Sequence, residues 1–312
     1  MQIIDSAQTR AHLAFEHLIP ALGAMFNQEC EVPLRHNHAM SLDGEQVGTV
    51  LIMPAWQPGK RLGIKVVTIY PGNAAQGQPG LNSIFSLFDA TTGVPLALLD
   101  GNEITSRRTA AAAALAAQSL SRPDSTRLFV VGAGRVATLV PYAFRSIRPI
   151  KEVKVWDIDV DRAQVLARQL RQDGFLADAI ADLRTGTEWA DIVSCATLSD
   201  KPLIQGKWLK PGTHLDLIGS FTPAMREADD HCFRVATVFV DTDEALQKSG
   251  DLLEPIKSGA FSPGRLAGTL AQLCRGERKG RCTNDEITIF KAVGTALEDL
   301  AAASLVYDRL HA

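Results

Sequence analysis

The chain has 312 residues, with 32 lysines and arginines against 35 aspartates and glutamates and a formal net charge of −3. It has no basic tail, which argues against nucleic acid or an anionic membrane as a partner. No segment approaches the roughly 20 uninterrupted apolar residues of a membrane span. One hydrophobic core rarely grows to this length, so two domains are expected.

The N-terminus and the cysteines indicate a cytoplasmic protein. Asp5 and Arg10 interrupt the N-terminal stretch, which is therefore not typical of a signal peptide. The five cysteines are scattered and form no CxxC pair, so reduced thiols are expected. No metal site is expected, because His36 and His38 would share one strand face without an evident further ligand nearby.

The first third of the chain predicts a helix over roughly residues 6–27 and then a β-rich region. Short apolar runs separated by Gly, Pro and Asn predict strands at 47–56, 63–71, 83–90 and 93–101. Thr92-Gly93 would form the tip of a hairpin. The stretch RLGIKVVTI at 61–69 is unusual, because Lys65 lies in an otherwise apolar strand.

Lys65 has two interpretations. Its ammonium group could reach solvent at a strand edge. Alternatively, it could point into a ligand site and exchange protons, because burial lowers a lysine pKa toward the range useful in acid–base catalysis. Period-2 alternation puts Val67 and Ile69 on the same face, which is not a solvated face, but this pattern leaves both interpretations open.

An alanine-rich helix is predicted over residues 104–120, with Thr105 or Ser106 as its N-cap. Arg107 and Arg108 would then lie in the first turn, where the helix dipole disfavours cations. A bound anion, such as a substrate carboxylate or a cofactor phosphate, would resolve this conflict. Solvated arginines are the alternative.

From Leu128 onward strands and helices alternate, which predicts a parallel sheet with crossover helices. The expected strands are 128–134, 153–159, 190–197, 213–220 and 237–242, with helices at 135–147 and 160–172. The final segment, 284–310, begins like a strand and continues as a long helix.

The first of these strands ends in the GxGxxA turn Gly132-Ala133-Gly134-Arg135-Val136-Ala137. The first glycine permits a tight turn, the second lets the backbone approach a pyrophosphate, and the alanine permits close helix–strand packing. Asp157, at the end of the next strand, is placed to bind the adenosine ribose hydroxyls. These residues predict a dinucleotide site; a tight turn without a ligand is the alternative.

Asp157 also bears on the choice of cofactor. A carboxylate repels a 2′-phosphate, and Ile158 and Asp159 follow it rather than an arginine. This favours NAD over NADP. Arg162 lies near enough in sequence to leave NADP open.

Several motifs, taken in order, make the chain resemble the ornithine cyclodeaminase/mu-crystallin family over most of its length. They are LRHN (34–37), LIMPAW (51–56), GIKVVTIYPGN (63–73), TSRRTAAAAALAA (105–117), VVGAGRVA (130–137), GSFTPAMRE (219–227) and VFVDTDEALQKSGDL (238–252). The resemblance implies an α/β fold in which a Rossmann-type NAD(P)-binding domain, 122–287, is inserted in a β-rich α+β substrate-binding and dimerisation domain, 1–121 plus 288–312. It also implies a homodimer.

The resemblance further implies roles for individual residues. Lys65 would be the catalytic lysine, and Arg35 and Arg108 would bind the carboxylate of a small imino or amino acid. Asn73 and Phe221 would also contact the substrate. The residues expected at the NAD(P) cofactor are Thr109, Gly132, Ala133, Gly134, Arg135, Val136, Ala137, Asp157, Ile158, Thr197 and Ser220.

The chain departs from the cyclodeaminase pattern at two places. Cyclodeaminases and the related archaeal alanine dehydrogenases carry a Gly-x-Asp-x-Pro pattern, and here Phe221 takes the aspartate position. Leu51 and Ile52 stand where cyclodeaminases carry an acidic residue before Met-Pro. Cyclisation of ornithine needs an acid to manage the protons of the distal amine, whereas Phe221 can pack on an apolar ring.

The leading prediction is therefore NAD(P)H-dependent reduction of a cyclic ketimine, pyrroline-2-carboxylate or piperideine-2-carboxylate. Ornithine cyclodeamination, or oxidative deamination of a small amino acid, is an alternative that requires a replacement carboxylate, and Asp229 and Asp230 lie close in sequence. A catalytically silent NAD(P)-binding protein is the third possibility, because the mu-crystallins that the chain resembles are also known as NADPH- and hormone-binding lens proteins.

Overall fold

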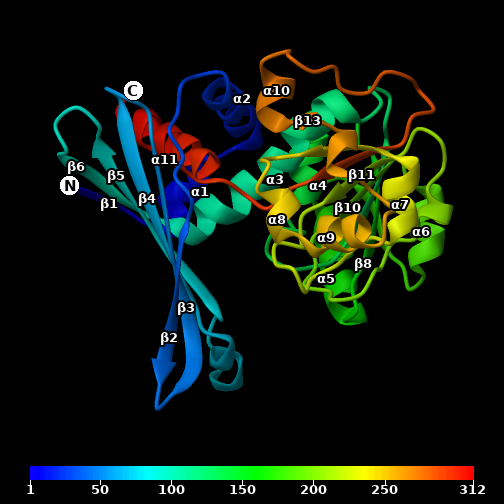
Figure 1. Cartoon of the computed structure of the whole chain (residues 1–312), viewed down its shortest axis with the longest axis horizontal. Helices are drawn as coiled ribbons and strands as arrows, with labels where there is room; N and C mark the ends of the chain where they lie inside the picture. The colour runs from blue at the N-terminus through cyan, green and yellow to red at the C-terminus, as the bar shows by residue number, and fades with distance from the viewer. The chain divides into compact units, whose positions relative to one another are not determined.

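A computed structural model describes residues 1–312, apart from the side chain of Ala74. The chain divides into two compact units (Figure 1). Unit 1 comprises Met1–Arg108 and Thr295–Ala312, and unit 2 comprises Thr109–Gly294. In the part of the chain that is described, no helix is both long and apolar enough to cross a membrane.

Unit 1 is built on a six-stranded sheet with the order β1-β6-β5-β4-β3-β2. Only the β1–β6 pair is parallel, and the other pairs are antiparallel. The strands are β1 (Gln2–Ile4), β2 (His36–Leu42), β3 (Glu45–Trp56), β4 (Arg61–Ile69), β5 (Leu81–Asp89) and β6 (Pro95–Asp100). Burial alternates along β4 and β5, because one face of the sheet is covered by helices.

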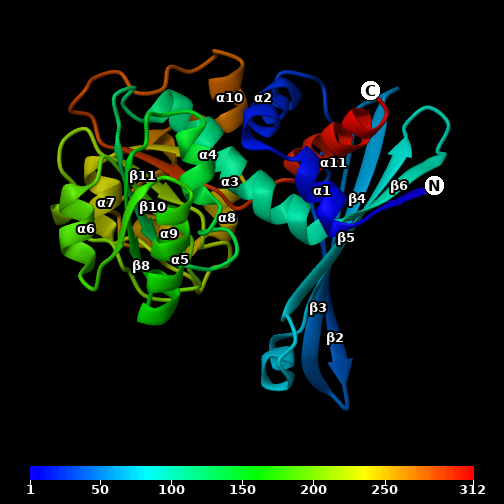
Figure 2. The same ribbon diagram turned by 180° about the vertical axis from the view of Figure 1, so that it is seen from behind.

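The helices of unit 1 are α1 (Ser6–His12), α2 (Phe15–Phe26) and α11 (Ala296–Leu310), with the short 3-10 helix η1 (Pro71–Gln76). Figure 2 shows α11 lying along the sheet, where it contacts β3, β4 and β5. The single helix predicted over 6–27 is two helices, because Leu13 and Ala14 leave the helical conformation. The Leu13 carbonyl there accepts a hydrogen bond from Arg107.

Unit 2 is built on an eight-stranded parallel sheet with the order β13-β12-β14-β11-β10-β7-β8-β9. The strands are β7 (Arg127–Val131), β8 (Glu152–Trp156), β9 (Leu176–Ala179), β10 (Ile192–Cys195), β11 (His214–Leu217), β12 (Thr237–Val240), β13 (Leu266–Thr269) and β14 (Thr288–Lys291). All residues of β10, β11 and β14 are buried, as expected for a parallel sheet covered on both faces.

The connections of unit 2 carry its helices. These are α4 (Val140–Arg145), α5 (Val160–Gln172), α6 (Leu183–Trp189), η2 (Gly206–Trp208), α7 (Asp230–Val235), α8 (Ala245–Lys248), α9 (Gly250–Lys257), η3 (Pro263–Arg265) and α10 (Leu270–Cys274). The chain leaves β7 toward β8 on one side and reaches β10 on the other, so the strand order reverses between β7 and β10. Dinucleotides bind at such a switch point in doubly wound sheets.

The predicted domain boundaries differ from this division. Strand β14 lies between β11 and β12, so residues 288–291 belong to the sheet of unit 2 rather than to unit 1. The first boundary falls inside helix α3 (Gly101–Leu120), after Arg108 instead of after residue 121. A strand at the far end of the chain can fill a central position in a sheet, and local sequence does not encode that position.

Two helix starts also differ from the prediction. Helix α3 begins at Gly101, where the Asp100 carboxylate accepts the Glu103 N–H at 2.8 Å, so Thr105 and Ser106 lie inside the helix instead of capping it. The helix predicted at 135–147 is regular only over Val140–Arg145 and is preceded by turns. Pro141 has no N–H to donate to the carbonyl of Ala137, which interrupts the helical hydrogen bonding there.

Candidate active site

Lys65 lies in the middle of β4, on the face of the sheet that the helices cover. It pairs with Met53 of β3 and Phe85 of β5 in the ladder, and its side chain is only 1% exposed. The interpretation of Lys65 as a solvated edge residue is therefore wrong, because β4 is an inner strand and its buried face carries Gly63, Lys65 and Val67.

The ammonium group of Lys65 is paired inside unit 1. Its Nζ lies 2.5 Å from Asp299 Oδ2 and donates a hydrogen bond to Thr105 Oγ1 at 3.3 Å. Asp299 is in the first turn of α11, which Thr295 caps at its N-terminus. An acid is stabilised at that end of a helix by the dipole, so the start of α11 provides a suitable partner for a buried lysine.

Arg108 is the second cation of this cluster. Its Nη1 lies 2.7 Å from Glu298 Oε2 and its Nε lies 2.9 Å from Asp299 Oδ1, and neither ion pair uses Nη2. Although burial opposes its charge, the carboxylates of Asp299 and Glu298 raise the pKa of Arg108 above its ordinary value. We call Lys65, Arg108, Glu298 and Asp299 the Lys65 cluster; its formal charges cancel.

The environment of Lys65 lowers its pKa toward the range in which a lysine can transfer protons near neutral pH. The pKa of Lys65 is lowered to about 8, chiefly by burial. Asp299 acts in the opposite direction, and the charges of Arg108 and Arg35 add to the lowering. Arg35 is partly buried, and its charge acts on Lys65. A lysine with such a pKa can lose and regain a proton near neutral pH.

Two other predicted residues of unit 1 serve the local structure. Arg107, expected beside an anion, instead donates to the Leu13 carbonyl and to Glu103 in the preceding turn, and α3 begins six residues before it. The anion expected from a first-turn arginine pair is therefore not required. Asn73 lies in η1, and its side chain donates to the Pro79 carbonyl at 3.0 Å.

In unit 2 the glycine turn follows β7 at the switch point. Gly132 has a φ of +113°, and an added Cβ would lie 2.7 Å from the Ala196 carbonyl oxygen, so only glycine fits. Nothing lies within 4 Å of a Cβ added at Gly134. Among the described hydrogen bonds, none engages the N–H groups of residues 134–137, and these groups suit the oxygens of a pyrophosphate.

Asp157 lies at the end of β8 and is bonded to the glycine turn. Its Oδ2 accepts the Ala133 N–H at 2.6 Å and its Oδ1 accepts the Asp159 N–H at 2.8 Å. Ile158 beside it is 90% exposed, and Leu198, after β10, is 78% exposed. Apolar side chains at the carboxyl ends of β8 and β10 are suited to flank an adenine ring, so the residues of this edge fit a dinucleotide.

The other residues predicted at the cofactor or the substrate differ in their local contacts and burial. Thr197 bonds to the buried Glu227 through both its N–H and its hydroxyl group, and the Ser220 hydroxyl donates to the Met225 carbonyl at 2.6 Å. Ala137 is fully buried under the turn. Phe221 follows β11 and is 43% exposed, which leaves its ring available to a ligand. Thr109 lies in α3 and is partly buried.

A sequence profile of the ornithine cyclodeaminase/mu-crystallin family matches residues 2–312. The chain belongs to this family.

The similarity extends to proteins with assigned reactions. A Δ1-pyrroline-2-carboxylate reductase of Paracoccus denitrificans is 42% identical over 267 residues, which cover 84% of each chain. The structure of a Δ1-pyrroline-2-carboxylate reductase of Thermococcus litoralis with NADH and L-proline superposes with a TM-score of 0.93 and 32% identity, covering 100% of this chain and 98% of that one. The structure of an archaeal alanine dehydrogenase dimer with bound NAD has a TM-score of 0.92 and 27% identity. The match covers 100% of this chain and 96% of that one.

The family membership and the α/β fold with a Rossmann-type domain, both expected from the sequence, are thereby confirmed. The sequence reasoning missed Glu298 and Asp299. Two adjacent acids in the apolar first half of the helix ALEDLAAASLVYDRL were the available signal, since acids are rarely buried without a cation. Glu227 was also missed, because its partners, two backbone N–H groups and one hydroxyl group, leave no sequence pattern.

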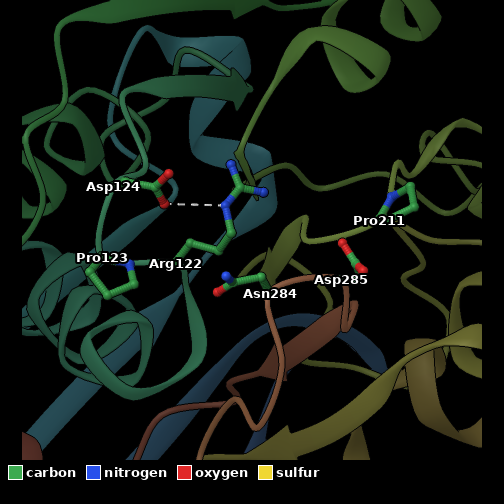
Figure 3. A pocket seen from close by; sticks show the side chains of 6 residues that line it. All are labelled: Arg122, Pro123, Asp124, Pro211, Asn284 and Asp285. Carbon is green, nitrogen blue, oxygen red and sulfur yellow. Dashed lines mark hydrogen bonds and ion pairs between the residues drawn. The ribbon is translucent and has the colours of Figure 1, made fainter.

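One surface pocket of unit 2 is separate from these residues. Figure 3 shows its lining, which consists of Arg122, Pro123, Asp124, Pro211, Asn284 and Asp285. These residues precede β7, β11 and β14, at the amino ends of the parallel strands, whereas ligands bind at the carboxyl ends. Arg122 is engaged by Asp124, Asp191 and the Gly212 carbonyl, so its charge connects loops.

Proposed function

We propose that this chain is an NAD(P)H-dependent reductase that converts a cyclic ketimine carboxylate, such as Δ1-pyrroline-2-carboxylate, to the corresponding cyclic amino acid. The observation that carries the proposal is the buried Lys65 cluster, in a chain similar to Δ1-pyrroline-2-carboxylate reductases over nearly its full length. Such a reaction also needs bound NAD(P)H, and the residues proposed to bind this cofactor lie at the carboxyl edge of the unit 2 sheet.

Lys65 is the proton donor of this mechanism. The ring nitrogen of a ketimine must gain a proton as the C=N bond is reduced, and a protonated imine is the better electrophile. At neutral pH a lysine with a pKa near 8 is mostly protonated, yet it gives up its proton more readily than an ordinary lysine. NAD(P)H, when bound, supplies the hydride to the imine carbon. Asp299 keeps the Lys65 ammonium oriented. After donating its proton to the imine nitrogen, the Lys65 amine regains a proton from water.

Arg35 and Arg108 are proposed to bind the substrate carboxylate. The two ion pairs of Arg108 fix its guanidinium plane, and Nη2 lies outside both of them. A guanidinium group held in this way binds a carboxylate without losing further side-chain freedom. Asn73 and Phe221 are proposed to contact the ring of the substrate. Thr109 is proposed to contact the cofactor phosphates.

NADH is the proposed preferred cofactor. Asp157 presents a carboxylate where NADP would carry its 2′-phosphate, and the exposed Ile158 follows it. Arg162, the nearest arginine in sequence, lies 3.4 Å from Asp159 in an exposed ion pair. We expect both cofactors to support turnover, with the lower KM for NADH.

The cyclodeaminase alternative is weakened by the acids that it would need. Phe221 replaces the aspartate of the cyclodeaminase pattern. Asp229 accepts the N–H groups of Gly206 and Cys232, and Asp230 pairs with Arg226 and accepts the Ser258 hydroxyl group. Both candidates are engaged in local structure, so neither is proposed to receive the distal amine of ornithine.

A homodimer in the cytoplasm completes the proposal. On the face of the unit 1 sheet opposite the helices, the side chains are largely apolar. Val66 pairs with Ile84 and Ile52 across the strands, and Ile84 is 48% exposed. A second copy would cover this face, as an apolar sheet face is rarely left in water. All five cysteines are free thiols, which suits a reducing compartment.

The experiment that tests the proposal measures oxidation of NADH and NADPH by the purified protein with Δ1-pyrroline-2-carboxylate, beside ammonia release from L-ornithine. Imine-dependent oxidation without ammonia is the expected result. Ammonia and proline from ornithine would contradict it and establish a cyclodeaminase. Cofactor binding without either reaction would establish a silent binding protein.

A further inference from the structure

Glu227 is a buried carboxylate at the carboxyl edge of the unit 2 sheet, and no step of the proposed mechanism uses it. It is fully buried. Its Oε1 accepts the Thr197 N–H at 2.7 Å and the Thr197 hydroxyl group at 2.8 Å, and its Oε2 accepts the Gly219 N–H at 2.7 Å. One side chain thus connects the loop that follows β10 with the loop that follows β11.

These two loops adjoin the glycine turn. A Cβ added at Gly132 would lie 2.7 Å from the Ala196 carbonyl oxygen and 3.3 Å from Thr197 Cγ2. A Cβ added at Gly219 would lie 2.1 Å from the Thr197 carbonyl oxygen and 2.4 Å from Glu227 Oε1. Close packing therefore runs from the glycine turn through Thr197 to Glu227 and Gly219.

A second layer fixes Glu227 itself. Asp251 Oδ1 accepts the Glu227 N–H at 2.8 Å and the Ala228 N–H at 3.0 Å. Asp251 Oδ2 lies 3.5 Å from the ammonium group of Lys291, and both side chains are fully buried. Burying three ionisable side chains is costly, and the loops that they connect lie at the edge where a doubly wound sheet binds its ligand.

We propose that Glu227 is the positioning residue of the cofactor site, holding the loops after β10 and β11 in the arrangement that receives the dinucleotide. This inference rests on the cofactor part of the proposed function and is independent of the imine chemistry. Glu227 acts through Thr197 and Gly219 and is not placed in contact with the cofactor.

The geometry makes the carboxylate itself necessary. All three partners of Glu227 are donors, and a carboxylate offers only acceptors. A glutamine of the same shape would point an NH₂ group at one of these donors and lose the hydrogen bonds to one loop. A residue that only fills space would tolerate this change, whereas a residue that positions both loops would not.

The test compares Glu227→Gln with the wild type by equilibrium titration with NADH. Asp191→Asn is the matched control, because Asp191 also accepts two backbone N–H groups, those of Thr126 and Arg127, but at the amino ends of the strands. We expect NADH to bind about tenfold more weakly to the Glu227→Gln protein, and as tightly as the wild type to the control. NADH affinity unchanged in Glu227→Gln would overturn the proposal.

Two further measurements separate positioning from general destabilisation. Hydrogen exchange in the cofactor-free protein should become faster over the segments containing Thr197 and Gly219 in Glu227→Gln, and unchanged exchange there would contradict the proposal. Glu227→Asp keeps the charge but shortens the reach, so it should bind NADH as weakly as Glu227→Gln. Wild-type affinity of that variant would show that charge alone suffices and would also overturn the proposal.

With an imine substrate, Glu227→Gln should raise the KM for NADH more than it lowers kcat at saturating NADH. If the wild type binds NADH but reduces no imine, the proposed reaction fails while the binding and exchange measurements still test Glu227.

Discussion

Lys65 remains charged in the interior of unit 1 because the start of α11 brings two carboxylates to it and to Arg108. A buried ion pair contributes little net stability, since the cost of removing two charges from water offsets their attraction. Such a pair is therefore weak evidence for a structural role. The lowered pKa of Lys65 supports a role in proton transfer instead.

Replacing Lys65 by Met tests that role at the level of one residue. The variant loses its general acid, so kcat/KM for imine reduction should fall by about 10²- to 10⁴-fold. NADH affinity should stay near that of the wild type, because the cofactor residues lie in unit 2. Lys60→Met is the matched control, since Lys60 is exposed and, among the described residues, its ammonium group bonds only to Gln28. Turnover that survives in Lys65→Met would refute the role.

The pH dependence of the reaction follows from the same residue. A general acid works only while protonated, so kcat/KM should fall as the pH rises through about 8, the pKa to which burial lowers Lys65. Asp299 raises that pKa, so Asp299→Asn should move the descending limb to lower pH. The measurement is a pH profile of imine reduction for both proteins. A limb that stays in place in Asp299→Asn would show that another group titrates.

At the residue level the sequence was informative where a side chain contradicted its surroundings. Lys65 in an apolar strand, the glycines of the GxGxxA turn and Asp157 after β8 could all be selected from local pattern. Glu298 and Asp299 could not be assigned to Lys65, because they lie at the opposite end of the chain and meet it only in the folded unit. Arg107 was misjudged because the start of its helix was misplaced.

At the level of elements, α3 shows how a cap decides where a helix begins. Asp100 precedes Gly101, and its carboxylate accepts the Glu103 N–H, so the helix starts one turn earlier than the alanine-rich stretch suggests. This earlier start places Thr105 and Arg108 in the helix interior, where Thr105 bonds to Lys65 and Arg108 pairs with Asp299.

Asp100→Ala should therefore destabilise unit 1 by about 1 kcal/mol, the usual contribution of an N-cap carboxylate. Urea unfolding of the variant beside the wild type measures this difference. Asp200→Ala, a change at an exposed acid, is the control and should leave the free energy of unfolding unchanged. An unchanged value for Asp100→Ala would show that the cap does not stabilise α3.

Alternating strands and helices allowed the parallel sheet of unit 2 to be predicted, because each βα unit carries its own hydrophobic pattern. The position of β14 between β11 and β12 could not be predicted. The turns at 135–139 could not be predicted either. They depend on Pro141, which has no N–H and so removes one helical hydrogen bond from a segment of good helix formers.

At the scale of the whole molecule, length alone predicted two domains, and contacts between distant segments decided their limits. The uncovered face of the unit 1 sheet supports the proposed homodimer. Ile84→Lys places a charge in the middle of that face and should convert a dimer to a monomer in analytical ultracentrifugation. Leu176→Lys, at an exposed apolar residue of unit 2, should leave the assembly unchanged. A dimer that persists in Ile84→Lys would place the interface elsewhere.

The proposed reaction is the reduction of a cyclic ketimine by direct hydride transfer, with Lys65 supplying the proton. The most direct measurement incubates the wild-type protein with Δ1-pyrroline-2-carboxylate and NADH that carries deuterium at both C4 positions, and analyses the product by mass spectrometry. Proline carrying one deuterium at Cα, formed at least about a hundredfold more slowly by Lys65→Met, is the predicted result. Unlabelled proline would contradict direct hydride transfer from NADH. No proline while NADH still binds would contradict the proposed reductase activity.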